Sequence, residues 1–433
     1  KKNKIMTHRI AKLLKILKTQ NIDYYLLSTS DEFLNEYVPP ENKRLEWITN
    51  FSGSNAIALI SSQKKFFFTD GRYFLQSKNE ISKSFKIFDI NKISFGKFLK
   101  ENLKNKKIML DMKTFSKEFI LKVIENLKTS NTNLIHDKLN LIDKIWENKL
   151  LEKKSLFFLD KKIVGQNTSQ KIKRLEDFNS EKRILIITSP ESVCWLLNIR
   201  GYDIEHTPLV LSRLIIKKGV IELFIDKKKL PLNYKKKWNR SISVFDINEF
   251  ETRISSFSGK RIYADSQISY YFFNILKKKN KNIIFGYDYC KLLKSQKNET
   301  EIKYSKKAHI SDAVALTKFY TWLEKNLKKK VTEFFISEKL EKIRQENTNY
   351  FSPSFPTIAA TGPNASIIHY KPQKKSSVLR ENQLFLCDSG GQYYGATTDI
   401  TRTVFLGNKA PKNLFRDIYT KVLIGHINIS MMK

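Results

Sequence analysis

The sequence predicts an α/β protein in which two similar small domains precede a third region of different construction. Up to about residue 297, short runs rich in β-branched and aromatic residues alternate with segments of helical periodicity, which is typical of α/β domains. After that point, two helical segments are followed by loops and strands. With 433 residues, 41% of them hydrophobic, the chain is long enough for several cores. We place the domains at 1–147, 148–297 and 298–433.

The first domain is predicted to open with an amphipathic helix, because Ile10, Leu13 and Leu17 recur at helical spacing with lysines between them. The elements expected after it are a strand, a β-hairpin, a further strand and a helix, at 24–27, 56–60 with 65–69, 108–110 and 120–127. The second domain repeats this pattern, with a helix, a strand, a hairpin, a strand and a helix expected at 170–178, 184–188, 209–216 with 220–225, 262–264 and 270–276.

The third region is predicted to begin with a long helix capped by Asn298 or Thr300, whose side chains accept hydrogen bonds from first-turn N–H groups. Its buried face is expected to include Ile310, Val314 and Phe319. The elements expected next are a second helix, four strand-like segments and a last helix still running at the final residue, at 332–345, 355–363, 367–370, 384–389, 397–405 and 412–433.

The formal net charge of +36 comes from 79 Lys and Arg against 43 Asp and Glu. The lysines are spread along the whole chain rather than gathered in one basic arm, so we interpret the charge as compositional bias and expect no specific nucleic-acid partner. No apolar run reaches the roughly 18 residues of a membrane helix, so no membrane association is expected. Three widely spaced cysteines offer no disulfide framework and fit a reducing compartment.

The chemistry is concentrated in residues 386–403, which read as two strands joined by a turn around Tyr393 and Tyr394. In a simple hairpin centred there, Asp388 lies opposite Asp399, with their Cβ atoms about 5 Å apart. Two facing carboxylates repel each other, so this arrangement calls for a cation, and such a pair can reach two metal ions. Spacing alone also allows two solvated aspartates, but the apolar residues that precede each one favour buried strands.

This hairpin resembles the metal-site hairpin of the aminopeptidase P and prolidase family, whose catalytic domain has the pita-bread fold. The segments that carry the resemblance occur in the same order along nearly the whole chain: TDGRYF at 69–74, WLLNIRG at 195–201, FPTI at 355–358, TGPN at 361–364, IHY at 368–370, DSGGQY at 388–393 and TDITRT at 398–403. The resemblance implies the three-domain cytosolic type, with two creatinase-like N-terminal domains before an incomplete pita-bread catalytic domain.

The resemblance also assigns roles to individual residues. Asp388 matches the first metal ligand of the family and Asp399 the second, which bridges two ions. The remaining ligands, one histidine and two glutamates, would lie beyond the end of this chain, so the chain alone is expected to be inactive. His369 matches a substrate-contacting histidine that can also handle protons, and Arg72 matches an arginine presented towards bound peptide. His426 is interpreted as a structural residue.

The activity that the resemblance implies is release of the N-terminal residue from peptides with proline in second position. Two Mn²⁺ ions are the expected cofactor, and ligand chemistry also allows Zn²⁺ or Co²⁺. A cytoplasmic homodimer is expected. The alternatives are a prolidase acting on Xaa-Pro dipeptides, which the doubled N-terminal domains disfavour, and a non-catalytic pita-bread binding module, which both retained aspartates disfavour.

Overall fold

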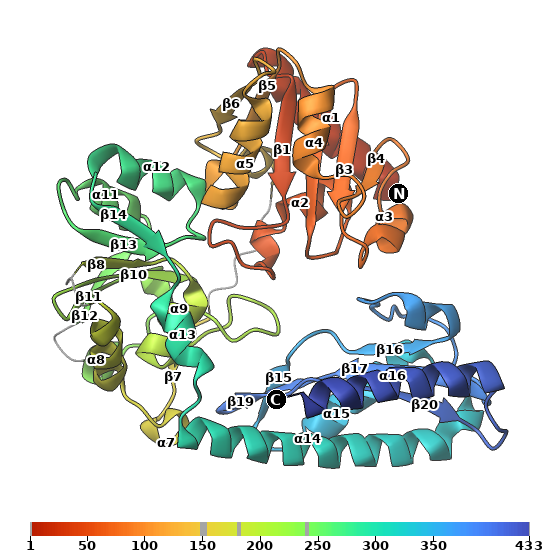
Figure 1. The fold of residues 1–433 in the computed structure, drawn as a ribbon. Coiled ribbons are helices and arrows are strands. Elements are labelled where there is room, and N and C mark those ends of the chain that lie inside the picture. The colour runs from red at the N-terminus through yellow and green to blue at the C-terminus, as the bar shows by residue number, and fades with distance from the viewer. Residues whose placement is uncertain (1, 148–153, 180–182, 239–241, 433) are drawn as a thin grey trace. The chain divides into compact units, whose positions relative to one another are not determined.

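A computed structural model describes residues 2–147, 154–179, 183–238 and 242–432 (Figure 1). The chain divides into two compact units, Lys1–Ile302 and Lys303–Lys433. The first unit contains two six-stranded sheets and the second contains two three-stranded sheets, so the predicted α/β class is confirmed. The predicted domain boundary at 147/148 adjoins residues 148–153, which lie outside the described residues. Among the residues described, every helix is too short or too polar to span a bilayer.

The first sheet has the strand order β4-β3-β2-β1-β5-β6, in which the antiparallel β1–β2–β3 run is continued by parallel neighbours on both sides. Its helices and strands are α1 (Lys2–Thr19), β1 (Tyr24–Ser28), α2 (Arg44–Thr49), β2 (Ala56–Ile60), β3 (Lys65–Thr69), α3 (Phe74–Glu80), β4 (Lys86–Asp89), α4 (Phe95–Asn102), β5 (Lys107–Leu110), α5 (Lys117–Leu127), β6 (Asn133–His136) and α6 (Leu141–Ile145). The predicted first helix and hairpin are confirmed, and Ile10, Leu13 and Leu17 of α1 are buried.

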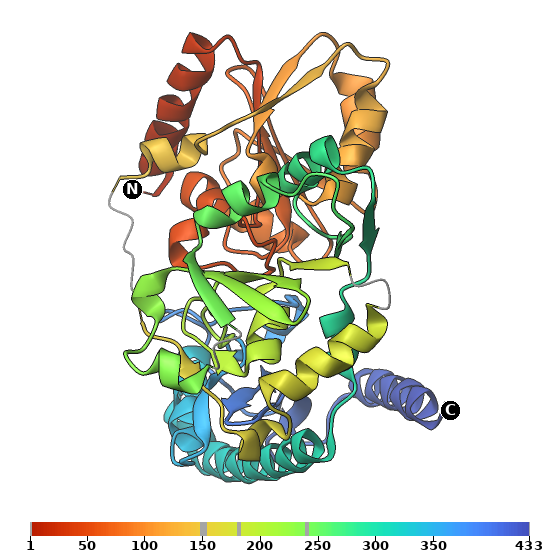
Figure 2. The same ribbon diagram turned by 90° about the vertical axis from the view of Figure 1, so that its left-hand side faces the viewer.

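The second sheet has the equivalent order β12-β11-β10-β8-β13-β14, again with an antiparallel centre and parallel edges. Its main elements are α8 (Thr168–Phe178), β8 (Ile184–Ile187), α9 (Pro190–Leu197), β10 (Ser212–Lys217), β11 (Val220–Ile225), β12 (Ile242–Asp246), α11 (Glu249–Ser255), β13 (Ile262–Asp265), α12 (Tyr270–Lys279), β14 (Ile283–Gly286) and α13 (Tyr289–Ser295). Helices α8, α9 and α13 cover one face and α11 and α12 the other (Figure 2). Short β7 (Phe157–Phe158) and β9 (Ile199–Arg200) pair beside it, and α7 (Lys161–Val164) and α10 (Tyr234–Lys237) complete the set.

The two sheets of the first unit are joined by equivalent elements. Ser116, the N-cap of α5, forms an antiparallel bridge with Ser269, the N-cap of α12. From the second domain, the Arg213 guanidinium donates a 2.8 Å hydrogen bond to the carbonyl of Glu32 and lies 4.0 Å from the ring centroid of Phe33. The first unit is therefore held together by backbone pairing as well as by a buried cation.

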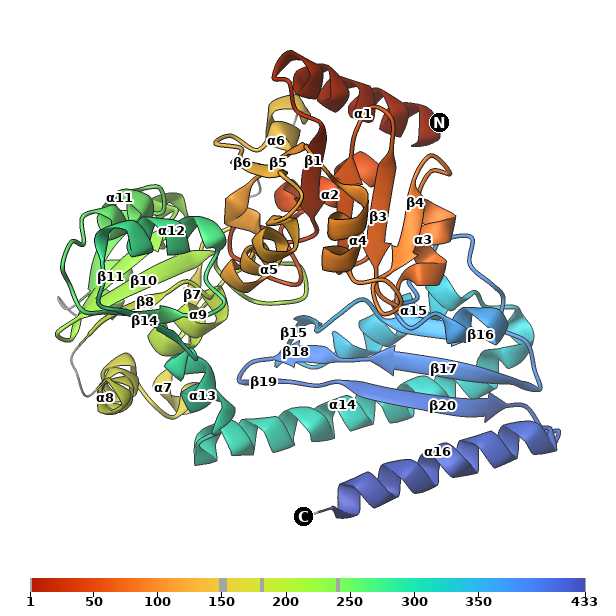
Figure 3. The same cartoon turned by 45° about the horizontal axis from the view of Figure 1, so that its top comes forward.

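The second unit packs two helices against one face of the sheet β16-β17-β20 (Figure 3). Its elements are α14 (Glu299–Asn326), which begins in the last residues of the first unit, α15 (Glu333–Arg344), β15 (Tyr350–Pro353), β16 (Ile358–Thr361), β17 (Gln383–Ser389), β18 (Gly391–Tyr393), β19 (Ala396–Thr397), β20 (Ile400–Leu406) and α16 (Asn413–Met431). The core between helices and sheet includes Phe319, Leu340, Phe385 and Cys387.

Two predictions about the secondary structure and burial of this unit are wrong. The segment 367–370 is a turn rather than a strand, because a 3-10 helix at Gly362–Ser366 leads directly into it. The predicted buried face of α14 is also rotated: Ile310 and Val314 are exposed, whereas Asp312 is fully buried.

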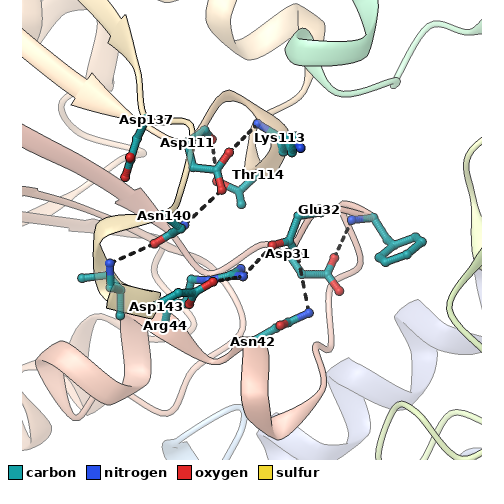
Figure 4. Close-up of polar contacts among 12 residues, drawn as sticks. Asp31, Glu32, Asn42, Arg44, Asp111, Lys113, Thr114, Asp137, Asn140 and Asp143 are labelled. Atoms are coloured by element: carbon teal, nitrogen blue, oxygen red, sulfur yellow. Dashed lines mark hydrogen bonds and ion pairs between the residues drawn. The ribbon is translucent and has the colours of Figure 1, made fainter. Parts of the chain in front are cut away.

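A cluster of buried acids lies at the carboxyl edge of the first sheet (Figure 4). Asp31, Asp111 and Asp137 follow β1, β5 and β6, which are parallel, so these side chains gather at one edge. Burial is the main cause that raises the pKa values of Asp31 and Asp111 to about 6. Neutral donors satisfy part of the cluster; for example, the amide of Asn140 donates to Asp111 over 3.2 Å.

We predict that this cluster makes the stability of the first unit fall as pH rises. Between the ordinary aspartate pKa of about 3.9 and the folded value of about 6, the folded protein binds more protons than the unfolded chain, so the free energy of unfolding decreases across that interval. Asp111→Asn is expected to flatten the decrease, and the exposed-site control Glu125→Gln is expected to leave it unchanged. Urea unfolding at pH 4 to 8 measures this; identical slopes for wild type and Asp111→Asn contradict it.

Candidate metal site

Asp388 and Asp399 lie on a hairpin formed by β17–β18 and β19–β20. The sequence-based register, which set the two aspartates directly opposite each other, is wrong by two residues, because Asp388 lies opposite Thr401. The turn falls at Tyr394 and Gly395 instead of Tyr393 and Tyr394, and Gly395 has φ +95°, a conformation that side chains with a Cβ rarely adopt.

The two carboxylates nevertheless interact. Asp399 lies two residues before Thr401, the partner of Asp388, and directly before the β17–β20 ladder begins at Ile400. The pKa of Asp399 is raised, first by partial burial and second by the negative charge of Asp388. The Thr401 hydroxyl donates a 2.7 Å hydrogen bond to Oδ1 of Asp388, which fixes that carboxylate on the hairpin.

Gly390 allows the two strands to approach closely between the aspartates. A Cβ at this position would lie 2.0 Å from the carbonyl oxygen of Thr398 and 2.3 Å from Oγ of Ser354. Ser354 donates from its hydroxyl to that same carbonyl over 2.9 Å and from its N–H to the carbonyl of Gly390 over 3.1 Å. Any larger residue at 390 would therefore push apart the strands that carry Asp388 and Asp399.

A fully buried ion pair lies behind the hairpin. Arg344 of α15 donates from Nε to Oδ1 of Asp312 over 2.7 Å, and Asp312 of α14 is, like Arg344, 0% exposed. The same carboxylate accepts hydrogen bonds from the hydroxyls of Tyr393 (3.0 Å) and Thr398 (2.8 Å). Arg344 also donates to Oγ of Ser389 over 3.1 Å. The residue after Asp388 and the residue before Asp399 are thus both bonded to one ion pair.

A second buried carboxylate holds the loop that contains His369. Glu333, at the start of α15 and 0% exposed, accepts hydrogen bonds from the backbone N–H of Thr361 (2.7 Å), the amide of Asn364 (2.9 Å) and the hydroxyl of Tyr370 (2.7 Å). These contacts span the loop from its first residue to the residue after His369. His369 itself is half-buried in the turn that follows the 3-10 helix.

The other predicted site residue, Arg72, belongs to the first unit. It follows β3 and donates from Nε and from its N–H to Oδ1 of Asp70, over 3.0 and 2.9 Å. This pairing holds the pKa of the Asp70 carboxyl below its ordinary value. The guanidinium lies 5.2 Å from the ring centroid of Tyr73 and its side chain is 40% exposed. Arg72 is therefore oriented by Asp70 yet accessible to a ligand.

The donor atoms at the hairpin fit a hard divalent cation. Asp388 and Asp399 provide carboxylate oxygens, the ligands that Mn²⁺ and Mg²⁺ prefer. Within the described ranges, no group of three or more His, Cys, Asp and Glu side chains is placed to hold a metal ion. His426 lies exposed on α16. The hairpin thus carries the two carboxylates that the sequence predicts as metal ligands.

Sequence reasoning missed the residues that support the site, namely Asp312, Arg344 and the loop-binding role of Glu333. A signal for Asp312 was present, since it lies at helical spacing with Ala308, Leu316 and Phe319, all of which are buried. The prediction that Ile310 and Val314 belong to the buried face excluded Asp312 from that face. The partners of Glu333 come from a loop whose conformation the sequence pattern did not predict.

Comparisons with known proteins agree with this architecture. Residues 9–144 and 147–301 each match a Creatinase/Prolidase N-terminal domain, and residues 303–433 match the metallopeptidase family M24. The fold and hairpin thus define a metallopeptidase with two creatinase-type domains before its catalytic domain.

Individual proteins similar to this chain indicate which group of metallopeptidases it belongs to. Xaa-Pro aminopeptidase 1 of Dictyostelium discoideum is 33% identical over 99% of this chain and 71% of its own length. A probable Xaa-Pro aminopeptidase P of Laccaria bicolor is 30% identical over 98% of this chain and 68% of its own length. The crystal structure of X-prolyl aminopeptidase from Caenorhabditis elegans, described as a cytosolic enzyme with a di-nuclear active site, superimposes with a TM-score of 0.88 at 29% identity, covering 94% of this chain and 70% of that one. The chain belongs to the Xaa-Pro aminopeptidases of metallopeptidase family M24.

Removing the Glu333 carboxylate is predicted to release the His369 loop. Glu333→Ala leaves three buried or half-buried donors without their acceptor, so the free energy of unfolding of the second unit should fall by about 3 kcal/mol. Amide hydrogen exchange at Thr361 should accelerate with it. The matched control is Glu338→Ala on the exposed side of the same helix. Equal exchange rates in the two variants would show that Glu333 does not hold the loop.

Proposed function

We propose that the protein is a metal-dependent aminopeptidase that releases the N-terminal residue from peptides with proline in second position. The observation that carries this proposal is the presence of Asp388 and Asp399 on one hairpin, where partial burial and the charge of Asp388 raise the pKa of Asp399, in a chain similar over 99% of its length to a named Xaa-Pro aminopeptidase. Two neighbouring carboxylates with no cationic side chain paired to either among the described contacts suit a divalent ion.

The chain's own residues have distinct roles in this reaction. When bound, a pair of divalent ions supplies an activated water and polarises the scissile carbonyl. Asp388 and Asp399 would hold and orient such ions, with Asp399 as the proposed ligand of both. His369, on the loop that Glu333 fixes, is the proposed substrate-contacting residue and can donate or accept a proton near the scissile peptide. Arg72, oriented by Asp70, is the proposed contact with bound peptide from the first unit.

We further propose Mn²⁺ as the physiological metal, because carboxylate-rich ligation suits it, although the same ligands accept Zn²⁺ or Co²⁺. A cytoplasmic location is supported by the C. elegans relative, which is described as cytosolic, and by three buried free cysteines. A homodimer and domain limits of 1–147, 148–297 and 298–433 belong to the same proposal.

Two substitutions in the holoenzyme test the assignment together. Asp399→Ala is expected to abolish turnover of an Xaa-Pro-containing peptide and to lower Mn²⁺ content, because a bridging ligand serves both ions. His369→Ala, the comparison variant, is expected to lower kcat by about 10²–10⁴-fold while metal remains bound. Metal content and peptide turnover are measured on the same samples. Full activity and metal in Asp399→Ala would refute the ligand assignment, and metal loss in His369→Ala would make that residue a ligand instead.

A further inference from the structure

We propose that the buried pair Asp312–Arg344 positions the metal-ligating carboxylates, and that it does so through the hydroxyls of Ser389 and Thr398. This inference rests on the proposed function. Neither member of the pair is placed to touch metal or substrate; both act through residues adjacent to the ligands.

One hydrogen-bond network connects the ion pair to both strands of the hairpin. The Thr398 hydroxyl donates to Oδ2 of Asp312 over 2.8 Å and accepts from the N–H of Gly391 over 2.9 Å. It therefore connects both strands of the hairpin to α14. On the opposite strand, Ser389 accepts from Arg344 over 3.1 Å. Ser389 and Thr398 are 0% and 1% exposed, so no solvent competes for these bonds.

The hydrogen-bond network lies where the pairing of the hairpin strands is interrupted. The regular ladder between β17 and β20 ends at Ser389 and Ile400, and the β18–β19 ladder begins only at Gln392 and Thr397. Asp399 lies in the interval between the two ladders, where the N–H of Thr398 still donates to the carbonyl of Gly391 over 2.9 Å but Asp399 itself has no ladder partner. The ion pair adds a constraint from two helices, which position side chains more precisely than loops do.

A purely structural ion pair would stabilise the fold without acting on metal. Such a pair can often be replaced by apolar residues with little loss of stability. Groups that orient metal ligands behave differently, because their removal typically costs about 10–100-fold in metal affinity. Metal affinity therefore separates a positioning role from a structural one.

The test is Thr398→Val in the holoenzyme, with Mn²⁺ affinity measured by titration of the metal-stripped protein and thermal unfolding measured in parallel. Valine keeps the shape and removes the hydroxyl, so the Kd for Mn²⁺ should rise about 10–100-fold. Thr398→Ser restores the hydroxyl and should return the Kd to within a few-fold of wild type. The matched control is Thr397→Val, which removes the neighbouring exposed hydroxyl bonded to Gln392 over 2.6 Å and should leave the Kd unchanged.

Ser389→Ala provides a second variant should Thr398→Val fold poorly, and it should weaken Mn²⁺ binding in the same direction. An unchanged Kd in Thr398→Val or Ser389→Ala, even with a lower unfolding temperature, would overturn the inference and leave the pair a structural one. Full-length wild-type enzyme that binds no Mn²⁺ would instead overturn the proposed function, and with it this inference.

Discussion

The buried ion pair between Asp312 and Arg344 is the interaction on which the second unit depends. Each ion alone would be costly in the interior, and breaking such a pair by removing one partner typically costs about 3–5 kcal/mol. Here the carboxylate is satisfied by two hydroxyls as well as by the guanidinium. Because these hydroxyls belong to Tyr393 and Thr398, the pair also joins α14 and α15 to the hairpin. The same ion pair therefore stabilises the packing of the two helices and fixes the geometry of the hairpin.

The carboxylates of this protein have three kinds of surroundings, and the kind of surroundings indicates which of them serve function. Asp312 is neutralised by an adjacent cation. Asp31 and Asp111 are buried among mostly neutral donors, and their pKa values rise to about 6. Asp399 is largely exposed, and its pKa is raised first by the partial burial of its carboxylate and second by the negative charge of Asp388. Among the described residues no cationic side chain pairs with Asp388 or Asp399, so a repulsion remains that a divalent ion would relieve, which is the physical basis of the proposed metal site.

The sequence predicted the α/β class, the main hairpins and the location of Asp388 and Asp399 on one hairpin, because these depend on local patterns. Short apolar and aromatic runs marked β2 and β3, and helical spacing marked α1. It failed where long-range contacts decide the outcome. The hairpin register depended on whether Tyr393 or Gly395 occupies the turn. The burial of Asp312 depended on an arginine 32 residues away, and the loop at 367–370 depended on Glu333. For Asp312 and for the loop, a side chain distant in sequence overrides the local pattern.

The proposed metal site requires that Asp388 and Asp399 together hold a pair of metal ions. Anomalous diffraction at the manganese edge, from crystals of the Mn²⁺-loaded holoenzyme, tests this requirement most directly. We expect two anomalous peaks about 3.5–4 Å apart, both in contact with the Asp399 carboxylate and one also in contact with Asp388. A single peak, or two peaks that leave Asp399 uncoordinated, would contradict it.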